Sequence, residues 1–255
     1  MVHYQIIAGE PIKIKIYEKV LVAEKEQKTI EVPASIKNKA CLEAVIFDLD
    51  GVIVDTAKYH YKAWKLMADN EGIYFDERIN ERLKGVSRTE SLKIIMEKSN
   101  REYTDDELKN LAAMKNTVYV KMLEELTPND ILPGIIDFIK ELKTDGIKLA
   151  IFSASKNTDF IIEKLKIKSY FDTVVTGNDV QRTKPDPEGF ILAAKKIGIE
   201  PKNCAVIEDA FAGIEGAKAA KMQGMGIGDR MQLYNADYVL VSTKYLTLEK
   251  VKMLF

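Results

Sequence analysis

The two aspartates that follow the apolar run at residues 44–47 have the types and spacing best suited to chemistry. The run predicts a strand buried on both faces, and Asp48 and Asp50 come directly after it, before Gly51. Side chains at i and i+2 of an extended segment project to the same side. Both carboxylates therefore leave the carboxyl end of a strand, where open α/β sheets bind ligands. Two anions so close call for a hard divalent cation such as Mg²⁺; the alternative is a solvated strand end.

Three further polar groups follow predicted strands later in the chain. Residues 153–157 (Ser-Ala-Ser-Lys-Asn) lead into a helix, where they form either an anion site or an ordinary N-cap. Lys184 lies in a non-helical turn before a proline and either binds a phosphoryl group or is a solvated surface lysine. Glu208 and Asp209 end another strand, as metal ligands or as an acidic helix start. Four acids gathered at strand ends would repel without a metal, which favours the metal site.

The elements that must position these residues belong to an alternating strand and helix pattern. The predicted strands after residue 135 are 148–152, 173–176, 204–207, 224–227 and 237–241, and the helices between them include 159–165 and 189–197. Such alternation implies right-handed crossovers and a parallel sheet with helices on both faces. We therefore predict an α/β, Rossmann-like core formed by residues 40–55 and 130–255.

A helical block at residues 56–129 interrupts this pattern. Apolar residues recur there at helical spacing, in three sets: Tyr59, Ala63, Leu66 and Met67; Leu92, Ile95 and Met96; and Leu108, Leu111, Met114 and Val118. Ordinary α/β connections are only a few residues long, so this block is expected to be a separate helical cap. Because it follows the first strand, it should cover the carboxyl ends of the sheet, with hinges near 55–57 and 127–133.

Residues 1–39 differ from the rest of the chain. Ile12, Ile14 and Ile16 alternate with lysines, which is the period of a half-buried strand, and two further apolar pairs follow. We predict a small antiparallel β-meander closed by Pro33 and a lysine-rich linker. The segment resembles the end of the C-terminal β-domain of inverting disaccharide phosphorylases such as maltose phosphorylase. A structural appendage or a dimer contact is expected here.

The composition is that of an ordinary globular protein. The chain has 255 residues, 46% of them hydrophobic and 30% charged, and a net charge of −1. This balance gives no electrostatic reason to expect a nucleic acid or a membrane as partner. The sequence has no bilayer-length apolar run and no signal pattern, and its two cysteines, Cys41 and Cys204, lack metal-ligand spacing. We expect a cytoplasmic protein with reduced core thiols, and the oligomeric state is left open.

Taken in order, the four groups resemble the four motifs of the haloacid-dehalogenase-like phosphotransferases, over nearly everything from Ala44 onward. The cap adds features of the β-phosphoglucomutase branch of that family, whose hinge threonine and histidine correspond to Thr56 and His60. The resemblance assigns substrate binding to Trp64, Lys84, Gly85, Val86, Ser87, Arg88, Ser91, Lys115, Asn116, Ala154, Ser155, Lys156 and Asn157. From the residues alone, His60 is a helix-surface residue, and Lys84 and Arg88 belong to a solvated helix end.

The resemblance also implies a mechanism. It assigns catalysis to Asp48, Asp50, Thr56, His60, Ser153 and Lys184, and Mg²⁺ binding to Asp48, Asp50 through its backbone carbonyl, Glu208 and Asp209. Asp48 would carry the phosphoryl group as an aspartyl phosphate, and Asp50 would be the general acid–base group. The implied reaction converts β-glucose 1-phosphate to glucose 6-phosphate through β-glucose 1,6-bisphosphate, so the expected partner is a small sugar phosphate.

Three other functions remain open from the sequence. A phosphatase of the same family would share the four core motifs. A signalling receiver module also gathers acids, a hydroxyl and a lysine on a parallel sheet, but the helical insertion and the spacing of Asp48 and Asp50 argue against it. An adaptor could use the N-terminal β-segment to bind a partner enzyme.

Overall fold

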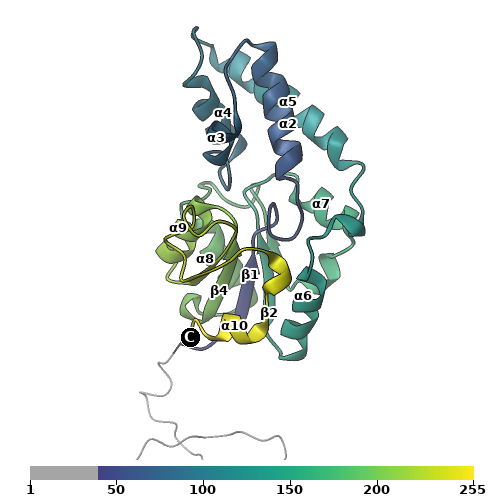
Figure 1. The fold of residues 1–255 in the computed structure, drawn as a ribbon, viewed down its shortest axis with the longest axis vertical. Helices are drawn as coiled ribbons and strands as arrows, with labels where there is room; N and C mark the ends of the chain where they lie inside the picture. Colours follow the sequence, from purple (N-terminus) through teal and green to yellow (C-terminus); the bar gives the residue numbers. More distant parts are fainter. Residues whose placement is uncertain (1–39) are drawn as a thin grey trace, which may run out of the picture. The chain divides into compact units, whose positions relative to one another are not determined.

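A parallel sheet lies at the centre of residues 40–255, the part of the chain that this computed structural model describes (Figure 1); the meander expected for residues 1–39 lies outside the described residues. Its six strands are ordered β3-β2-β1-β4-β5-β6, and every neighbouring pair is parallel. The strands are β1 (Ala44–Phe47), β2 (Lys148–Phe152), β3 (Thr173–Val175), β4 (Cys204–Glu208), β5 (Gln223–Ile227) and β6 (Tyr238–Leu240). The predicted α/β, Rossmann-like core is confirmed.

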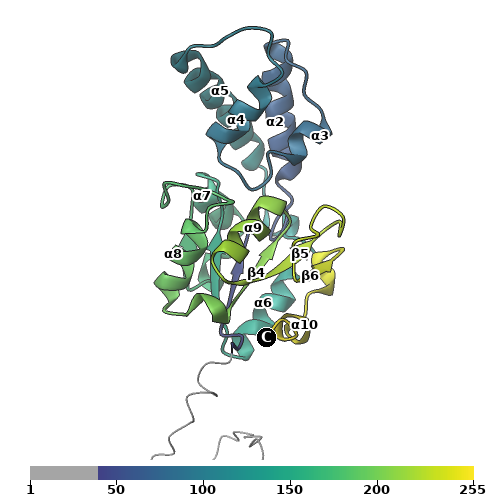
Figure 2. The same ribbon diagram turned by 90° about the vertical axis from the view of Figure 1, so that its left-hand side faces the viewer.

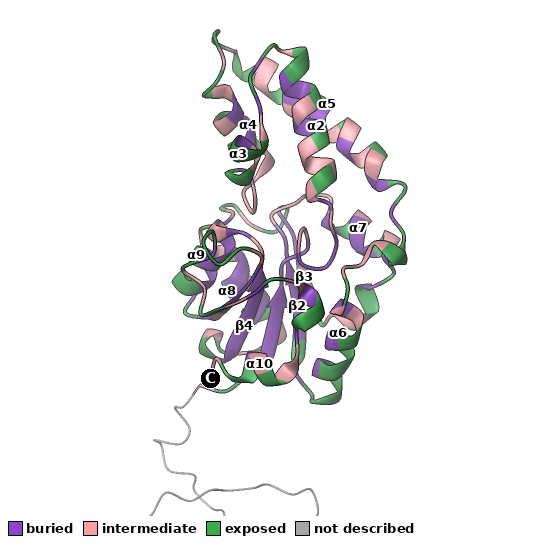
Figure 3. Cartoon of the chain, in the orientation of Figure 1, coloured by how far each residue is buried: buried purple, intermediate pink, exposed green. Residues whose placement is uncertain are grey.

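Helices cover both faces of the sheet because the side chains of β1 alternate between two hydrophobic layers. Val45 and Phe47 belong to one layer, and Ala44 and Ile46 to the other. The first layer includes residues of α6 (Ile135–Thr144), α7 (Thr158–Lys164) and α10 (Leu248–Lys252), and the second those of α8 (Glu188–Ile197) and α9 (Phe211–Ala219). Figure 3 shows the resulting band of buried strands between exposed helix surfaces.

Four helices stand between β1 and α6 and lie beyond one end of the sheet in both views (Figures 1 and 2). They are α2 (Ala57–Asn70), α3 (Glu77–Glu81), α4 (Arg88–Met96) and α5 (Asp105–Leu123). A hydrophobic cluster of their own includes Trp64, Met67, Phe75, Leu92 and Ile95, so the block has an interior distinct from that of the sheet. We refer to these four helices as the cap.

The two chain segments that join the cap to the sheet lie side by side. Val54 and Ile131 form an isolated antiparallel bridge, and the Leu132 N–H donates to the Ile53 carbonyl oxygen at 2.8 Å. A short 3₁₀ helix, Pro128–Asp130, precedes this second segment. The bridge directly precedes residues 55–57 on one segment and lies within residues 127–133 on the other, the two places where the sequence predicts hinges.

The expectation that both cysteines are core thiols is wrong for Cys41. Cys204 is buried in β4, but Cys41 precedes β1, lies outside the ladder of the sheet and is exposed. Its Sγ donates to Glu43 Oε1 at 3.5 Å. Among residues 40–255, no helix is both long enough and apolar enough to cross a membrane.

Gly189 allows α8 to pack directly against the end of β2. A Cβ at this position would lie 2.0 Å from Cζ of Phe152, a fully buried side chain. We expect Gly189→Ala to lower the free energy of unfolding by about 1–3 kcal/mol because of overpacking. This loss should occur although alanine is favoured in helices by about 1 kcal/mol. Urea unfolding measures it, and adding Phe152→Leu should restore part of the stability. A Gly189→Ala variant as stable as the wild type would contradict this packing.

Candidate active site

The register of the sheet brings the motif residues to one edge. Phe47 is opposite Ile151 on one side and Ile207 on the other, so the next residues of all three strands leave the sheet at the same level. The Asp48 N–H donates to the Ile207 carbonyl oxygen at 2.9 Å, which extends the ladder by one residue. Asp48 and Glu208 are therefore neighbours at the carboxyl edge of the sheet.

Lys184 lies buried between these two carboxylates. Its ammonium donates to Asp48 Oδ1 and Glu208 Oε1, and the side chain is inaccessible to solvent. The rings of Phe152 and Phe190 lie 5.0 Å and 5.5 Å from Nζ. Burial alone would lower the pKa of Lys184, but the two carboxylates raise it above its usual value. The alternative of a solvated surface lysine is wrong.

Asp48, Glu208 and Asp209 form an acidic cluster that can hold a divalent metal ion. One oxygen from each lies within 4.8 Å of the others. Burial raises the pKa of Asp48 well above its usual range, against the effect of Lys184. Burial and then Glu208 raise the pKa of Asp209 to about 7. Two buried carboxylates and the half-buried Asp209 fit a hard cation, which takes oxygen ligands.

Gly51 lets the loop after β1 lie against this cluster. Its φ is +92°, and a Cβ there would lie 2.3 Å from Asp209 Oδ2. A side chain at this position would therefore displace the Asp209 carboxylate, so glycine is required on both conformational and steric grounds.

The Asp50 side chain is not one of the three carboxylates of the acidic cluster and is held by hydroxyl groups. Oδ1 accepts from Thr56 Oγ1, and Oδ2 accepts from Ser153 Oγ at 3.3 Å. Any metal contact by Asp50 would therefore come from its backbone carbonyl. Burial raises the pKa of Asp50, against the hydrogen bond from Thr56. Ser153 Oγ also accepts from the Ser155 N–H at 3.1 Å, whereas the N-cap residue of α7 is Asn157, so Ser153 does not cap that helix.

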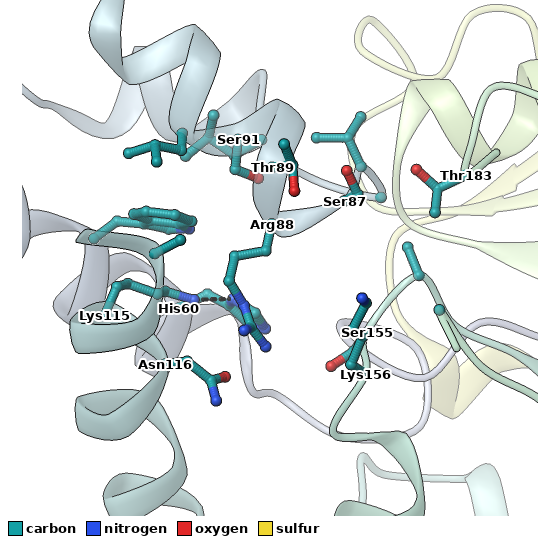
Figure 4. Close-up of a pocket in the computed structure, with 18 of the residues that line it drawn as sticks. His60, Ser87, Arg88, Thr89, Ser91, Lys115, Asn116, Ser155, Lys156 and Thr183 are labelled. Carbon is teal, nitrogen blue, oxygen red and sulfur yellow. Dashed lines mark hydrogen bonds between the residues drawn. The ribbon is translucent and has the colours of Figure 1, made fainter. Parts of the chain in front are cut away.

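The cap contributes a buried lysine and a neutral histidine to the same region. Lys115 Nζ lies 2.9 Å from His60 Nδ1, and His60 Nε2 lies 4.0 Å from Asp50 Oδ1 (Figure 4). Burial, with help from the charge of Arg88, lowers the pKa of Lys115 to about 7. Burial and then the charges of Lys115 and Arg88 lower the pKa of His60 well below its usual value. His60 is therefore neutral and can accept a hydrogen bond from Lys115 through Nδ1.

Tyr119 is a site residue that the sequence analysis did not identify. It lies four residues after Lys115 on α5, and its ring centroid is 4.0 Å from that of His60. Its hydroxyl lies 3.5 Å from Asp50 Oδ1, the outer limit of a hydrogen bond. Burial and then the charge of Asp50 raise the pKa of Tyr119 well above its usual value, so the phenol keeps its proton. The sequence does contain a signal for Tyr119. It lies four residues after Lys115, and this spacing places the two residues on one face of a helix.

A cavity of about 640 Å³ lies between the cap and the sheet edge. Every predicted substrate-binding residue lines it, as do Asp48, Asp50, His60 and Ser153; the wall also includes Thr183, which was not predicted. Thr56, Lys184 and Glu208 are buried outside the wall of the cavity. Figure 4 shows Arg88, the first residue of α4, and Ser87, its N-cap, on the cap side, and Ser155 and Lys156 on the core side.

Two further contacts link cap and core. Asn157 Nδ2 donates to Asn116 Oδ1 at 2.9 Å, which joins the start of α7 to α5. Lys84 Nζ lies 4.0 Å from Asp209 Oδ2 and 3.0 Å from Glu81 Oε2. The alternative of a solvated helix end is therefore wrong for Lys84, and Arg88 is half-buried in the wall of the cavity.

Comparison with known proteins places this architecture among characterised enzymes. A beta-phosphoglucomutase of Bacillus subtilis is 43% identical over 210 residues, covering 82% of this chain and 93% of that protein. A phosphorylated carbohydrates phosphatase of Thermotoga maritima is 31% identical, covering 71% of this chain and 83% of that protein. The crystal structure of a beta-phosphoglucomutase from Clostridium difficile has a TM-score of 0.80 at 42% identity, covering 84% of this chain and 96% of that one.

The family model described as haloacid dehalogenase-like hydrolase matches residues 42–221, which include all four motifs at the sheet edge. Members of this family that transfer phosphoryl groups use a divalent metal, in agreement with the acidic cluster. The resemblance drawn for residues 1–39 lies outside the described residues and stays a prediction. The chain belongs to the haloacid dehalogenase-like hydrolase family, and the expected similarity to its β-phosphoglucomutases is confirmed.

Proposed function

We propose that this chain is a Mg²⁺-dependent β-phosphoglucomutase. It would interconvert β-D-glucose 1-phosphate and glucose 6-phosphate through an aspartyl phosphate on Asp48 and a β-glucose 1,6-bisphosphate intermediate. The observation that carries the proposal is the group formed by His60, Lys115 and Arg88, which the cap presents to the cavity opposite Asp48 and Asp50. Similarity to two β-phosphoglucomutases along nearly their whole length supports it.

In the first chemical step, Asp48 attacks the phosphoryl group and the sugar oxygen departs. Lys184 already contacts Asp48 and holds positive charge where the transferring oxygens gather. The Ser153 hydroxyl lines the cavity beside Asp50 and can donate to the same oxygens. Mg²⁺ held by Asp48, Glu208, Asp209 and the Asp50 backbone carbonyl would neutralise the charge that develops on the phosphoryl group.

Asp50 moves the proton in both half-reactions. It protonates the departing sugar oxygen when the bond to phosphorus breaks, and it removes the proton from the attacking sugar hydroxyl in the return step. The raised pKa of Asp50 brings the carboxyl closer to the range in which it can do both. Thr56 and His60 position it from the hinge segment and from α2.

A mutase must transfer the phosphoryl group to sugar and exclude water, and a closing cap offers a physical means. We treat residues 56–129 as the cap domain and residues 40–55 and 130–255 as the core domain. The phosphate remote from Asp48 would lie among Arg88, Lys115 and Asn116 from the cap and residues 153–157 from the core. Its binding energy would favour the closed state. A cytoplasmic location stays a prediction.

A sugar-phosphate phosphatase of the same family is the second candidate. Two relatives, at 31% and 30% identity, are phosphatases, and the core motifs serve both reactions. The deciding assay follows glucose 6-phosphate and inorganic phosphate in parallel, from β-glucose 1-phosphate with Mg²⁺ and a trace of bisphosphate primer. The α-anomer is the substrate control. Predominant release of inorganic phosphate would favour the phosphatase.

Replacing Asp48 by asparagine should reduce turnover to background, because the amide is a poor nucleophile. No aspartyl phosphate should form when the variant is mixed with bisphosphate. The matched control is Asp137→Asn, on the exposed side of α6, which should keep wild-type turnover. A variant at Asp48 with near-normal turnover would exclude the covalent route.

Replacing Arg88 by alanine should raise the ratio of inorganic phosphate to glucose 6-phosphate. Arg88 begins α4 and projects into the cavity, where its planar fork can bind a phosphate bidentately (Figure 4). Loss of such a charged hydrogen bond is worth about 1.5–3 kcal/mol, so KM should rise roughly tenfold or more. Arg78→Ala, an exposed change on α3, is the control. An unchanged product ratio would count against this role.

Lys115 should make stability depend on pH. Its folded-state pKa of about 7 is below the value of about 10.4 for an unfolded lysine. Between these values the unfolded chain holds a proton that the folded protein has released, so stability rises with pH in this window. The cost of the buried charge is fully present below pH of about 7.

The free energy of unfolding of the wild type, relative to Lys115→Met, should therefore increase from pH of about 7 to about 10. Urea unfolding across this range measures the difference. Lys121→Met, at an exposed position of the same helix, is the control. A difference that does not change with pH would contradict the depressed pKa.

A further inference from the structure

Tyr119 is buried where the cap helix α5 approaches the core, and its hydroxyl lies beside Asp50 and Thr56. The side chain is completely inaccessible and belongs to the hydrophobic layer of the sheet, together with Val52, Ile53 and Val54. Its only polar atom lies 3.5 Å from Asp50 Oδ1. The nearby Lys115 ammonium lies over its ring, 4.6 Å from the centroid, and does not compete for the hydroxyl.

The two oxygens of Asp50 have different surroundings. Oδ1 accepts from Thr56 Oγ1, faces the Tyr119 hydroxyl and lies 4.0 Å from His60 Nε2. Oδ2 faces Ser153, which lies on the side where the phosphoryl group is expected. Oδ1 is therefore occupied by groups of the hinge and cap, and Oδ2 is left on the side of Ser153, a residue of the cavity wall.

We propose that Tyr119 is a positioning residue that fixes Oδ1 of Asp50 toward the cap and thereby assigns proton transfer to Oδ2. This inference rests on the proposed mutase function. As the bond between the sugar oxygen and phosphorus forms, the bond between phosphorus and Asp48 breaks, and the hydroxyl proton of the sugar passes to Oδ2. Tyr119 makes no bond in this step and acts through the orientation of Asp50.

The origin of Tyr119 in the cap gives this contact a role that Thr56 cannot fill. Thr56 immediately precedes α2 in the hinge segment, whereas Tyr119 is on α5, the helix that also carries Lys115 and Asn116. The orientation of Asp50 thus depends on the seating of α5 against the core. Catalytic hydrogen bonds are often long before substrate binds and tighten in the reacting complex, so the 3.5 Å separation suits this role.

The test is Tyr119→Phe, which removes the hydroxyl and keeps the ring. The matched control is Tyr103→Phe in the cap, whose hydroxyl donates to Glu71 Oε2 at 3.0 Å and lies outside the cavity wall. Enzyme phosphorylated with β-glucose 1,6-bisphosphate is mixed rapidly with β-glucose 1-phosphate or with buffer. Bisphosphate formation and inorganic phosphate release are then measured, together with steady-state kcat, KM and urea unfolding.

We expect Tyr119→Phe to slow transfer to the sugar, and kcat, by about three- to tenfold, the effect of one long and weak hydrogen bond. KM should stay within about twofold, because the lost group does not bind substrate. The ratio of sugar transfer to hydrolysis should fall, whereas Tyr103→Phe should leave it unchanged. An unchanged ratio in Tyr119→Phe, or an equal loss in both variants, would overturn the inference.

These outcomes are separable from failure of the proposed function. If the wild type makes no glucose 6-phosphate, the mutase proposal fails. The inference is then tested in the formation of aspartyl phosphate from a sugar phosphate, where Asp50 protonates the departing oxygen. Slower formation in Tyr119→Phe would support the positioning role, and an unchanged rate would overturn it.

Discussion

The concentration of buried negative charge at the carboxyl ends of β1 and β4 is the constraint on which the rest of the structure depends. Taking a carboxylate out of water costs several kcal/mol unless a countercharge and hydrogen bonds compensate for it. Lys184 supplies one such charge to both Asp48 and Glu208, and the two phenylalanine rings beside it exclude water. Burial first, and then the neighbouring carboxylates, raise the pKa values of Asp48 and Asp209 although Lys184 opposes the change. The remaining charge makes the edge a place for a divalent ion.

A second electrostatic arrangement, of opposite sign, faces this cluster from the cap. Burial, and then the positive charges held close together there, depress the pKa values of His60 and Lys115. A phosphate group would relieve this repulsion, so the cap side is complementary to the anionic end of a substrate. The core holds the groups that transfer the phosphoryl group, and the cap holds groups suited to binding the anionic end of a substrate.

Much of the core could be predicted because each motif follows a buried strand. The strand at residues 148–152 was predicted with its observed limits, and the parallel register then places Asp48 beside Glu208. The cap was harder to predict. Helical spacing groups Met114 with Leu111 on one apolar face, yet Met114 is exposed, whereas Lys115 and Tyr119 are buried. The reason is that α5 packs on two bodies, with Leu111 in the cap cluster and Tyr119 in the layer of the sheet. A single periodicity cannot describe a helix with two buried faces.

The bridge between Val54 and Ile131 has a consequence for how one set of residues can serve two half-reactions. The bridge joins the two segments that connect cap and core, so they form one short hinge, and the proposed closure of the cap would be a rotation about it. With such a hinge, the cap would reach the same closed position in each half-reaction. An intermediate that enters first with one phosphate inward and then with the other thus meets identical machinery both times. The two half-reactions therefore need only one active site.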